Sequence, residues 1–470
     1  MLGITSYGAY VPKYRLSAET VAQVWGKRGG KEERSVANYD EDSLTMAVEA
    51  AWDCLSPEVR AGVKSLFFAS TTSPYREKQC ASIVAGALDL PNDISTVDFA
   101  NSLRAGSNAL KLALDSVKLA GGQALVTAAD CRLGYPQTPQ EMGFGDAGAA
   151  ISVGSSGVIA ELEASHTVSD DITDVWRKSD DEFVRSWEDR WVITYGYEKN
   201  IRAAVSGLLK ATGHKPADFS KVVMYAPDAR SHDALAKALG FEKTQVQDSL
   251  LSKAGNSGAA HAILMLAGAL EQSAPGDRIL FVTYGDGADA FSFKVTEDIN
   301  KVKRPLGLKG NLASRKPLSS YGKYLTFRNL IEQPEEFVRA FPSATVMWRS
   351  RKWALRCHGS KCRKCGTVAF PIQRICFECH SRDDFDEVRL SDKKGKVFTF
   401  SIDNLAGTPD APVVQTVLES EEGNARVYCL MTDCESTEVK VGMPVELTFR
   451  RFHEMGGFVN YYWKCRPVRG

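Results

Sequence analysis

The stretch STVDFANSLRAGSNALKLALDSVKLAGGQALVTAA, residues 95–129, decides the fold class. Its first five residues, 95–99, are strand-like, and residues 105–119 carry apolar side chains at helical spacing. The closing piece, 124–129, is a short apolar run typical of a buried strand. A strand, an amphipathic helix and a buried strand in this order predict a layered α/β domain.

The same alternation continues on both sides of this stretch. Before residue 160, strands are expected at 65–69 and 147–153 and a helix at 81–88. The pattern then recurs as helices and strands at 200–212, 221–226, 231–239, 258–271, 278–284 and 288–295. Two halves of similar order, 1–160 and 195–300, predict an internal duplication. The stretch between them, about 160–195, is expected to be an insertion or a cap.

The composition is that of an ordinary globular protein. The chain has 470 residues, of which 44% are hydrophobic and 25% charged, and this excludes disordered, collagenous and disulfide-scaffold classes. The 58 basic and 58 acidic residues cancel, which argues against a general polyanion binder. No apolar run approaches the roughly 18 residues of a membrane span. Residues 1–16 show no secretory signal, so we expect a cytoplasmic protein without a membrane partner.

Charge is uneven along the chain. Residues 301–385 hold 18 lysines and arginines against 6 acidic residues. Residues 301–344, which also carry scattered proline and glycine, are predicted to be a basic linker. A solvated connector is the favoured explanation, and a surface for the phosphates of coenzyme A or an acidic partner is the functional alternative.

Cysteines cluster in the basic region. The sequence Cys362-Arg-Lys-Cys365 is followed by ten residues and then by Cys376-Phe-Glu-Cys379. Two CxxC turns can supply four thiolates to a tetrahedral metal, and four protein ligands leave no open position. The spacing therefore predicts a zinc ribbon over 345–385 with structural Zn²⁺. The neighbouring Cys357, His358 and His380 are expected to be bystanders.

Short strands follow the cysteine cluster. They are expected at 396–402, 413–418, 425–431 and 445–449, and several strands within a hundred residues predict a small β-barrel over 386–470. A basic zinc ribbon could bind nucleic acid. No aromatic platform or recognition helix accompanies it, however, so nucleic-acid binding is the disfavoured hypothesis.

Two resemblances cover most of the chain. Residues 356–379, with Gly366 and Phe370-Pro371, resemble the ribbon of a zinc-ribbon/OB-fold family that accompanies thiolases and hydroxymethylglutaryl-CoA synthases. Residues 1–300 resemble the prokaryotic hydroxymethylglutaryl-CoA synthases of the thiolase superfamily. The matching pieces are Gly3-Ile4, 10–15, 22–26, 40–42, 73–75, 144–150, Gly255-Asn256, 275–280 and Tyr284-Gly285. This resemblance implies a duplicated α-β-α-β-α domain over 1–300, an OB-fold over 386–470, and a coenzyme A thioester as candidate ligand.

The catalytic positions of that family are replaced here. The family uses a cysteine nucleophile at a helix start, a histidine and a glutamate. Aligning 98–106 with the cysteine motif puts Leu103 at the nucleophile position. The corresponding alignments put Tyr225 at the histidine and Thr71 at the glutamate, and only Asn256 is retained.

Other residues could in principle take over the chemistry. Ser102 adjoins Leu103 and is the weak alternative nucleophile, although Tyr225 offers it no histidine base. Cys80 and Cys131 are expected to be buried structural thiols. His232 and His261 fall on or near helices and are expected to pack or lie on the surface.

Three hypotheses follow. The first is a scaffold subunit of an acyl-CoA thiolase or acyltransferase complex, in which the zinc-ribbon/OB part docks or completes a catalytic thiolase. Such a chain would form a homodimer or hetero-oligomer. The second is an active acyl-CoA condensing or cleaving enzyme with a displaced site built from Ser102, Tyr225 and Asn256. The third is the nucleic-acid binder. The sequence leaves the acyl group and the partner open.

Overall fold

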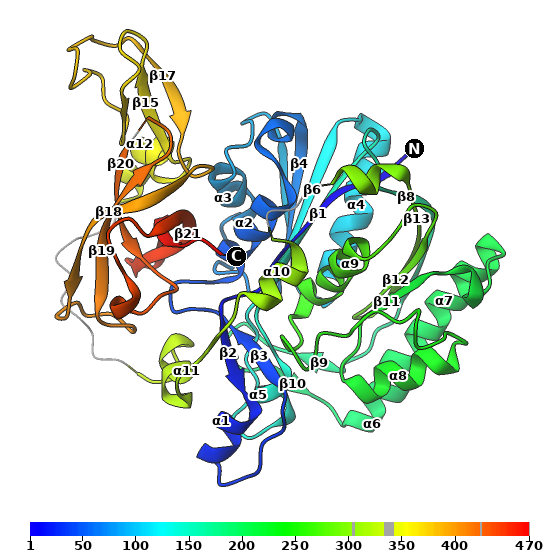
Figure 1. Ribbon diagram of the computed structural model, residues 1–470. Coiled ribbons are helices and arrows are strands. Elements are labelled where there is room, and N and C mark those ends of the chain that lie inside the picture. The colour runs from blue at the N-terminus through cyan, green and yellow to red at the C-terminus, as the bar shows by residue number, and fades with distance from the viewer. Residues whose placement is uncertain (303–305, 333–342, 424, 470) are drawn as a thin grey trace. The chain divides into compact units, whose positions relative to one another are not determined.

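A computed structural model describes residues 1–302, 306–332, 343–423 and 425–469 (Figure 1). The chain divides into two compact units. The first unit comprises Met1–Ala37, Asp42–Ala85 and Leu90–Tyr324. The second unit comprises Asn38–Glu41, Gly86–Asp89 and Leu325–Gly470, so two short early segments belong to the later unit.

A mixed β-sheet runs through the first unit. Nine strands of the described chain form it in the order β11-β12-β13-β8-β1-β7-β6-β4-β5. Their bounds are β1 Gly3–Tyr10, β4 Val63–Ala69, β5 Ser95–Phe99, β6 Gln123–Asp130, β7 Ala147–Gly154, β8 Ala160–Ser169, β11 Lys221–Met224, β12 Arg278–Tyr284 and β13 Gly287–Val295. The strand pairing confirms the α/β class that residues 95–129 predict.

The sheet contains the predicted duplication. In the first half β1 pairs with β7 and β7 with β6, both antiparallel, and β6 pairs with β4 in parallel. In the second half β8, β13, β12 and β11 repeat this order and these directions. The parallel β5 of the first half has its counterpart in a single parallel bridge between Val222 and Val246. The halves meet where β1 pairs with β8.

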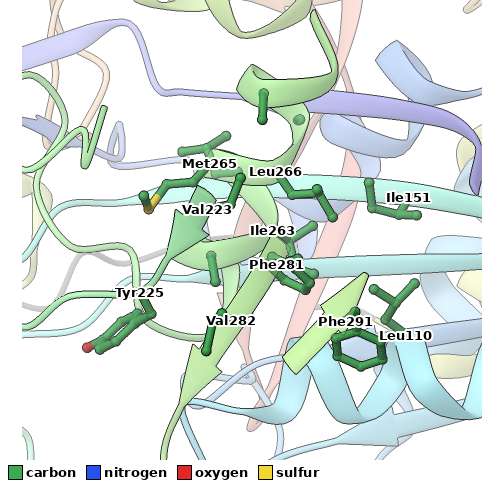
Figure 2. Close-up of a cluster of buried hydrophobic side chains, with 14 of the residues drawn as sticks. Leu110, Ile151, Val223, Tyr225, Ile263, Met265, Leu266, Phe281, Val282 and Phe291 are labelled. Atoms are coloured by element: carbon green, nitrogen blue, oxygen red, sulfur yellow. The ribbon is translucent and has the colours of Figure 1, made fainter. Parts of the chain in front are cut away.

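Helices occupy equivalent places in the two halves. The pairs are α2 Ser43–Cys54 with α7 Lys199–Thr212, α3 Cys80–Ala87 with α8 Ala229–Ala238, and α4 Ala105–Ala120 with α9 His261–Glu271. Helix α2 packs on β1 and β7, and α7 on β8 and β13, whereas α4 and α9 pack on each other and on the sheet. All residues of α9 from His261 to Leu270 are buried, as a middle layer requires (Figure 2).

Shorter elements complete the first unit. They are β2 Tyr14–Ser17, α1 Ala18–Val24, β3 Glu33–Val36, η1 Pro57–Gly62, α5 Pro139–Gly143, β9 Val175–Trp176, β10 Arg185–Ser186, α6 Asp189–Trp191, η2 Val192–Glu198, η3 Pro216–Asp218, η4 Gly258–Ala260, η5 Glu297–Lys301, α10 Gly307–Ala313, β14 Lys316–Pro317 and α11 Tyr321–Phe327. The last of these helices ends beyond the boundary of the first unit.

Two expectations about connecting segments need correction. Residues 160–169, expected within an insertion, form strand β8, which lies between β13 and β1 and whose exposed residues alternate with partly buried ones. The expected linker 301–344 contains α10, which packs on α9 and β1. Its Asn311 Nδ2 donates to the Ala9 carbonyl at 3.0 Å, so the start of this segment is an integral part of the first unit.

The second unit holds the zinc ribbon and a closed barrel. Helix α12 Ala344–Ala354 precedes a three-stranded sheet of β16 Val368–Ala369, β15 His358–Cys362 and β17 Phe385–Arg389. The barrel order is β18-β19-β20-β22-β21, with bounds β18 Lys394–Asp403, β19 Val413–Ser420, β20 Arg426–Met431, β21 Pro444–Met455 and β22 Phe458–Pro467, and η6 Ser436–Glu438 follows β20. The predicted OB-like barrel is confirmed, with β22 as a strand that the sequence analysis missed.

In the described part of the chain, no helix is both long enough and apolar enough to cross a membrane.

Candidate functional site

The candidate site of the first unit forms where strands end and two middle-layer helices begin. Thr71 follows β4 and Tyr225 follows β11, which is the equivalent strand of the second half. Leu103 precedes α4, and Asn256 precedes η4 and α9 at the equivalent place. The two halves of the sheet therefore contribute equivalent strand ends and helix starts to the site, and carboxyl ends of strands form the edge where ligands bind in open α/β sheets.

Two adjoining cavities open at this edge. The first cavity has a volume of about 430 Å³, is mostly apolar, and is lined by Tyr225 and Asn256 among others. The second cavity has a volume of about 350 Å³ and is lined by Thr71 and Ser102, with several charged residues. Three residues line both: Leu103, Arg132 and Val175. The structure therefore brings all five sequence-predicted positions of the site to one pair of cavities.

The position of the family's cysteine nucleophile holds the hydrocarbon side chain of Leu103. Leu103 lies in a turn that Asn101 enters with φ +68°, and its side chain packs against the buried core. Gly285 has φ +148°, which favours glycine, and a Cβ there would lie 3.0 Å from Ser102 Oγ and 3.1 Å from Leu103 Cβ. Likewise, a Cβ at Gly106 would lie 2.5 Å from the Ala259 carbonyl, where α4 meets η4. The scaffold around the position is kept while the thiol is absent.

Tyr225 stands at the histidine position. Its ring is 4% exposed and contacts the edge of His261 at 5.8 Å between centroids. Its hydroxyl accepts from Asn256 Nδ2 at 2.9 Å. Burial raises the pKa of the Tyr225 phenol, so it is neutral and keeps its proton. Tyr225 can therefore donate a hydrogen bond, but it is not the base that a nucleophile would need.

Thr71 stands at the glutamate position and is held by a buried carboxylate. Its Oγ1 donates to Asp130 Oδ2 at 2.9 Å, and its backbone N–H donates to Asp130 Oδ1 at 2.7 Å. Four further donors, from Ser70, Thr72 (two) and Ala259, occupy the same carboxylate. Six donors fix the Asp130 side chain, so it organises the loop around Thr71.

Of the alternative catalytic residues, only Ser102 lines one of the two cavities. Ser102 Oγ accepts from the Arg104 N–H at 3.2 Å. The described residues that line the two cavities include no cysteine, histidine or glutamate. Burial raises the pKa of the Cys80 thiol to about 12 and lowers that of His261 to about 3, so neither group is charged near neutral pH. Burial also lowers the pKa of His232.

Cys131 is the remaining sulfur near the site. It is partly buried, and its backbone N–H donates to Thr72 Oγ1 at 2.9 Å. Its side chain is not among those that line the two cavities.

Sequence reasoning missed two polar residues of the site. Arg132 is 4% exposed, lines both cavities and lies 4.0 Å above the Phe144 ring. Asp174 accepts a hydrogen bond from the Tyr284 hydroxyl, and burial raises the pKa of this carboxyl. Arg132 could have been found, because it follows the strand 124–129 at the edge where the other site residues lie.

The four predicted metal ligands lie together in the second unit. The Sγ atoms of Cys362, Cys365, Cys376 and Cys379 lie within 4.8 Å of one another. Two pairs, Cys362–Cys379 and Cys365–Cys376, are 3.6 and 3.5 Å apart. Four sulfurs at 2.3 Å from a tetrahedral Zn²⁺ are about 3.8 Å apart, so this set fits the metal. The four thiolates would hold Zn²⁺ as a structural ion.

The neighbouring residues have other partners. His358 Nε2 lies 2.7 Å from Asp89 Oδ2, and Nδ1 lies 3.1 Å from Glu387 Oε2, so both ring nitrogens face carboxylates. Cys357 is fully buried, and burial raises its pKa to about 12. The His380 N–H donates to the Cys376 carbonyl at 3.0 Å and closes the second knuckle.

The duplicated sheet, the buried helix pair and the cavities at the starts of α4 and α9 define a thiolase-like protein. Solved structures agree. An HMG-CoA synthase complexed with CoA superimposes with a TM-score of 0.65 at 19% identity, covering 73% of this chain and 95% of that one. The 3-oxoacyl-[acyl-carrier-protein] synthase III of Aquifex aeolicus gives a TM-score of 0.56 at 21% identity, covering 63% and 100%.

Proteins of similar sequence identify the family within the thiolase-like class. The hydroxymethylglutaryl-CoA synthase of Methanopyrus kandleri is 34% identical over 346 residues, covering 70% of this chain and 98% of the relative. That of Archaeoglobus fulgidus is 34% identical over 349 residues, covering 71% and 100%. The chain belongs to the hydroxymethylglutaryl-CoA synthase family.

Two family models match parts of the chain. Residues 209–295 match the C-terminal part of 3-oxoacyl-[acyl-carrier-protein] synthase III, which agrees with the thiolase-like second half. Residues 359–386 match the rubredoxin-like zinc ribbon domain of ChsH2. The second match confirms the zinc ribbon predicted from the cysteine spacing.

Proposed function

We propose that this chain is a non-catalytic member of its family, which binds an acyl-CoA and serves as a subunit of an acyl-CoA thiolase or acyltransferase complex. One observation carries the proposal. At the start of α4, between the two cavities, the nucleophile position holds Leu103, and the cavities have no cysteine, histidine or glutamate among their described lining residues. Covalent thioester chemistry needs a nucleophile and a base in reach of one another.

The acyl-CoA part of the proposal rests on what the first unit keeps. Its two cavities persist, and Gly285 still allows the close approach beside Leu103. Solved structures of similar fold include a synthase with CoA and another with an acyl donor carrier protein. A coenzyme A thioester is therefore the ligand class that we assign to the first unit.

The docking part of the proposal rests on the second unit. Its second knuckle carries Ile375 and Phe377, which are 56% and 59% exposed. Large apolar side chains that remain in water mark a surface for a protein partner. We assign the surface of this knuckle, with Ile375 and Phe377, to the catalytic thiolase subunit.

A homodimer through the first unit is part of the same proposal. Strand β5 is the last strand of the sheet in the described chain, and its burial alternates between exposed and half-buried residues. Unpaired edge strands readily pair with another chain. A second copy of β5 would satisfy this edge, so sizing should give at least a dimer.

The second candidate is an enzyme with a displaced site. The observation that favours it is the contact of the Tyr225 hydroxyl with Asn256 at 2.9 Å beside the first cavity. A neutral phenol held in this way could supply a proton to a bound thioester. Ser102 would have to act without a neighbouring base.

The experiment is purification of the native complex, followed by incubation with radiolabelled acetyl-CoA. We expect a thiolase to co-purify and the chain itself to carry no stable acyl adduct. The paired replacements Ile375→Asp and Phe377→Asp should release the thiolase, whereas Leu119→Asp, at a position 91% exposed in the first unit, should not. A chain that purifies without a thiolase and carries an acyl adduct would favour the displaced-site enzyme.

A further inference from the structure

A short hairpin with little buried surface forms part of the walls of both cavities. Its strands β9 and β10 pair with each other as a separate two-stranded sheet, outside the nine-stranded sheet (Figure 1). Of residues 175–187, only Val184 is buried. Segments with few buried contacts open locally at a lower free energy than the core does. Residues 174–187, which we call the cavity hairpin, can therefore move while the sheet stays folded.

The cavity hairpin contributes side chains to each cavity. Val175 lines both cavities, and Ser186 lines the first. Trp176, Arg177 and Val184 line the second. A displacement of the hairpin would therefore widen both cavities at once.

Contacts within the hairpin hold its tip and its base together. Asp181 Oδ2 accepts from the Lys178 N–H at 2.9 Å, and Asp181 Oδ1 pairs with Arg185 at 2.8 Å. At the base, the Trp187 N–H donates to the Asp174 carbonyl at 2.9 Å. Because these contacts join residues of the hairpin to one another, they persist when it moves as one rigid piece.

One edge of the cavity hairpin is held by two arginine side chains. Arg76, in the loop that carries Thr71, donates to the Ser179 carbonyl and pairs with Asp180 at 3.0 Å. The two side chains of this pair are 69% and 94% exposed, and ion pairs so exposed contribute little and are screened by salt. From the hairpin, Arg177 donates to the Thr71 carbonyl. This edge therefore depends on long, charged side chains.

The opposite edge is held by backbone and apolar contacts. The Val184 N–H donates to the Leu133 carbonyl at 2.9 Å. The Phe183 ring stacks on Tyr135 with 4.7 Å between the centroids. Salt does not screen contacts of these kinds, so the two edges of the hairpin differ in what holds them.

We propose that the cavity hairpin is a flap that opens along its Arg76 edge, turns about its Val184 edge and so admits an acyl-CoA to the cavities. Arg76 and Arg177 are the latch of this flap. The inference rests on the proposed acyl-CoA binding and adds how access to that site is controlled. Because the latch joins the flap to the loop of Thr71, opening it exposes the second cavity first.

The first test needs no ligand. Ser102, which lines the second cavity, is replaced by cysteine in the full-length chain, and its alkylation by a bulky maleimide is followed by peptide mass spectrometry. Adding Arg76→Ala should speed the alkylation about threefold to fivefold, because an exposed ion pair holds the closed flap only weakly. Raised salt should speed it in the chain that keeps Arg76 and have little further effect in Arg76→Ala.

The matched control is Arg230→Ala, at an exposed arginine of α8 outside the hairpin, which should leave the alkylation rate unchanged. An alkylation rate that does not respond to Arg76→Ala would overturn the inference. It would also fail if Arg230→Ala sped the reaction as much, since the effect would then not belong to the latch.

The second test closes the flap. Arg76→Cys and Asp180→Cys would be joined by a cleavable bismaleimide, and the binding of an acetyl-CoA that carries a fluorescent etheno-adenine would be followed by stopped-flow mixing. We expect association to slow about tenfold or more and to recover when the cross-link is cleaved. Arg76→Ala alone should raise the dissociation rate constant about threefold to fivefold.

The two tests separate this inference from the proposed function. If the fluorescent acetyl-CoA binds the cross-linked chain as fast as the free one, the flap is wrong while the proposed acyl-CoA binding stands. If it binds none of these chains but the alkylation rate follows the latch, the acyl-CoA binding is wrong and the flap stands as a gate to the cavities.

Discussion

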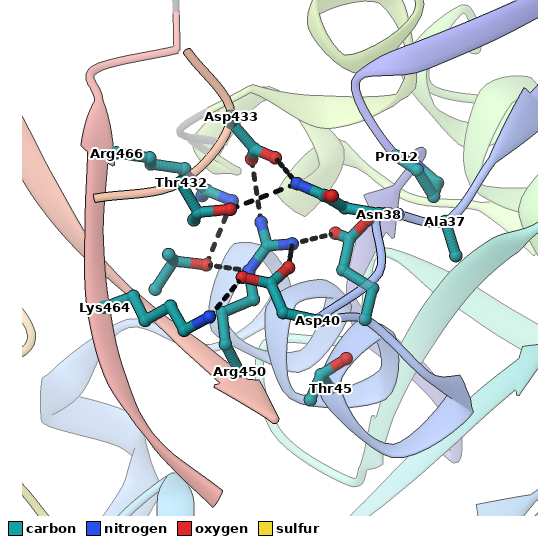
Figure 3. A network of polar contacts seen from close by, with 12 residues as sticks. Pro12, Ala37, Asn38, Asp40, Thr45, Thr432, Asp433, Arg450, Lys464 and Arg466 are labelled. Carbon is teal, nitrogen blue, oxygen red and sulfur yellow. Dashed lines mark hydrogen bonds and ion pairs between the residues drawn. The ribbon is translucent and has the colours of Figure 1, made fainter. Parts of the chain in front are cut away.

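Two buried arginines, one in each unit, have opposite surroundings. In the second unit, Arg450 is fully buried and contacts Asp40, Glu41 and Asp433, while Lys464 contacts Asp40 at 2.8 Å (Figure 3). In the first unit, Arg132 is almost as deeply buried beside two cavities and has no carboxylate partner among the described residues. Three carboxylates surround the Arg450 guanidinium, whereas the described residues around Arg132 provide none.

The two units also differ in how many of the residues expected at their sites are present. The four cysteines of the ribbon are all present and gathered, because the metal is needed for folding. In the thiolase-like site, the positions that the resemblance assigns to the reacting groups hold Leu103, Tyr225 and Thr71, beside two cavities and closely packed glycines.

The largest effect should come from removing a metal ligand. Cys362→Ser or Cys376→Ser should release the zinc and unfold the second unit, because structural zinc supplies about 10–16 kcal/mol in small zinc domains. Metal analysis and thermal unfolding would measure both effects. The first unit should keep its own transition. Cys434→Ser, at a cysteine outside the knuckles, is the control and should retain one zinc per chain.

A wild-type-like melting profile after complete loss of zinc would remove the contrast between the two units. The ribbon would then be held together by its strands alone.

The next largest effect concerns turnover. The purified chain should neither condense acetyl-CoA with acetoacetyl-CoA nor cleave a 3-ketoacyl-CoA, because losing a nucleophile removes roughly a millionfold of rate in well-analysed triads. Leu103→Cys alone should restore little, since Tyr225 cannot replace a histidine. The Methanopyrus kandleri relative is the positive control for the assay.

Turnover by the unmodified chain would be followed with Ser102→Ala. If activity were lost in that variant, the scaffold proposal would be wrong and the displaced-site enzyme would replace it.

Breaking the buried charge network should lower the free energy of unfolding of the second unit less than losing the metal does, but more than a substitution at the surface. Arg450→Met leaves Asp40, Glu41 and Asp433 buried without their shared cation, which should destabilise the second unit by about 3–5 kcal/mol. Denaturant unfolding would measure the change. Arg451→Met is the matched control, because the adjacent side chain is 33% exposed and pairs with Glu454 at the surface, where less than about 1 kcal/mol is expected.

Equal costs for the two arginine variants would show that the buried network contributes no more than the surface pair. Stability measurements would then give no support to the contrast between Arg450 and Arg132.

The smallest effect should depend on pH. Burial alone would lower the pKa of His358, but the carboxylates of Asp89 and Glu387 raise it overall above its usual value. Arg356 and Lys352 in turn contact these two carboxylates. The stabilisation by charged His358 is therefore fully present below about pH 6.5 and is lost as pH rises through the raised pKa. His358→Gln should cost about 1 kcal/mol at pH 5.5 and almost nothing at pH 9.

Stability curves at several pH values would measure this change. His453→Gln is the control with the opposite sign, because burial lowers the pKa of His453 and its protonation does not favour folding. If His358→Gln lowered the free energy of unfolding by the same amount at every pH, the ion-pair explanation would be wrong.

Much of the fold follows from periodicity. The strands at 95–99 and 278–284 have the predicted bounds, since both are short β-type runs with clear breaks. Strand β8 was missed because one of its faces is polar and resembles a charged insertion. Strand β22 mixes aromatic and basic residues, and its Lys464 and Arg466 are buried only because acids from elsewhere meet them.

The two candidate sites differ in how far sequence can predict them. The cysteine cluster is local, so its spacing alone predicts the metal. The positions of Leu103, Tyr225 and Thr71 came from family resemblance, and the structure brings them to shared cavities. The place of Arg132 at the site could have been inferred from the strand that it follows, but the lack of a carboxylate around it could not. That property exists only once distant segments have packed.

The composition of the second unit has a consequence for how the protein is made. Asp40 and Glu41 are synthesised 410 and 409 residues before Arg450, the cation that they surround. At about 5–20 residues per second, these acids wait roughly 20–80 seconds for their partner to leave the ribosome. The second unit therefore completes its interior only after synthesis has nearly ended. A fragment beginning at Leu325 would carry the barrel but lack two of the acids that its Arg450 needs.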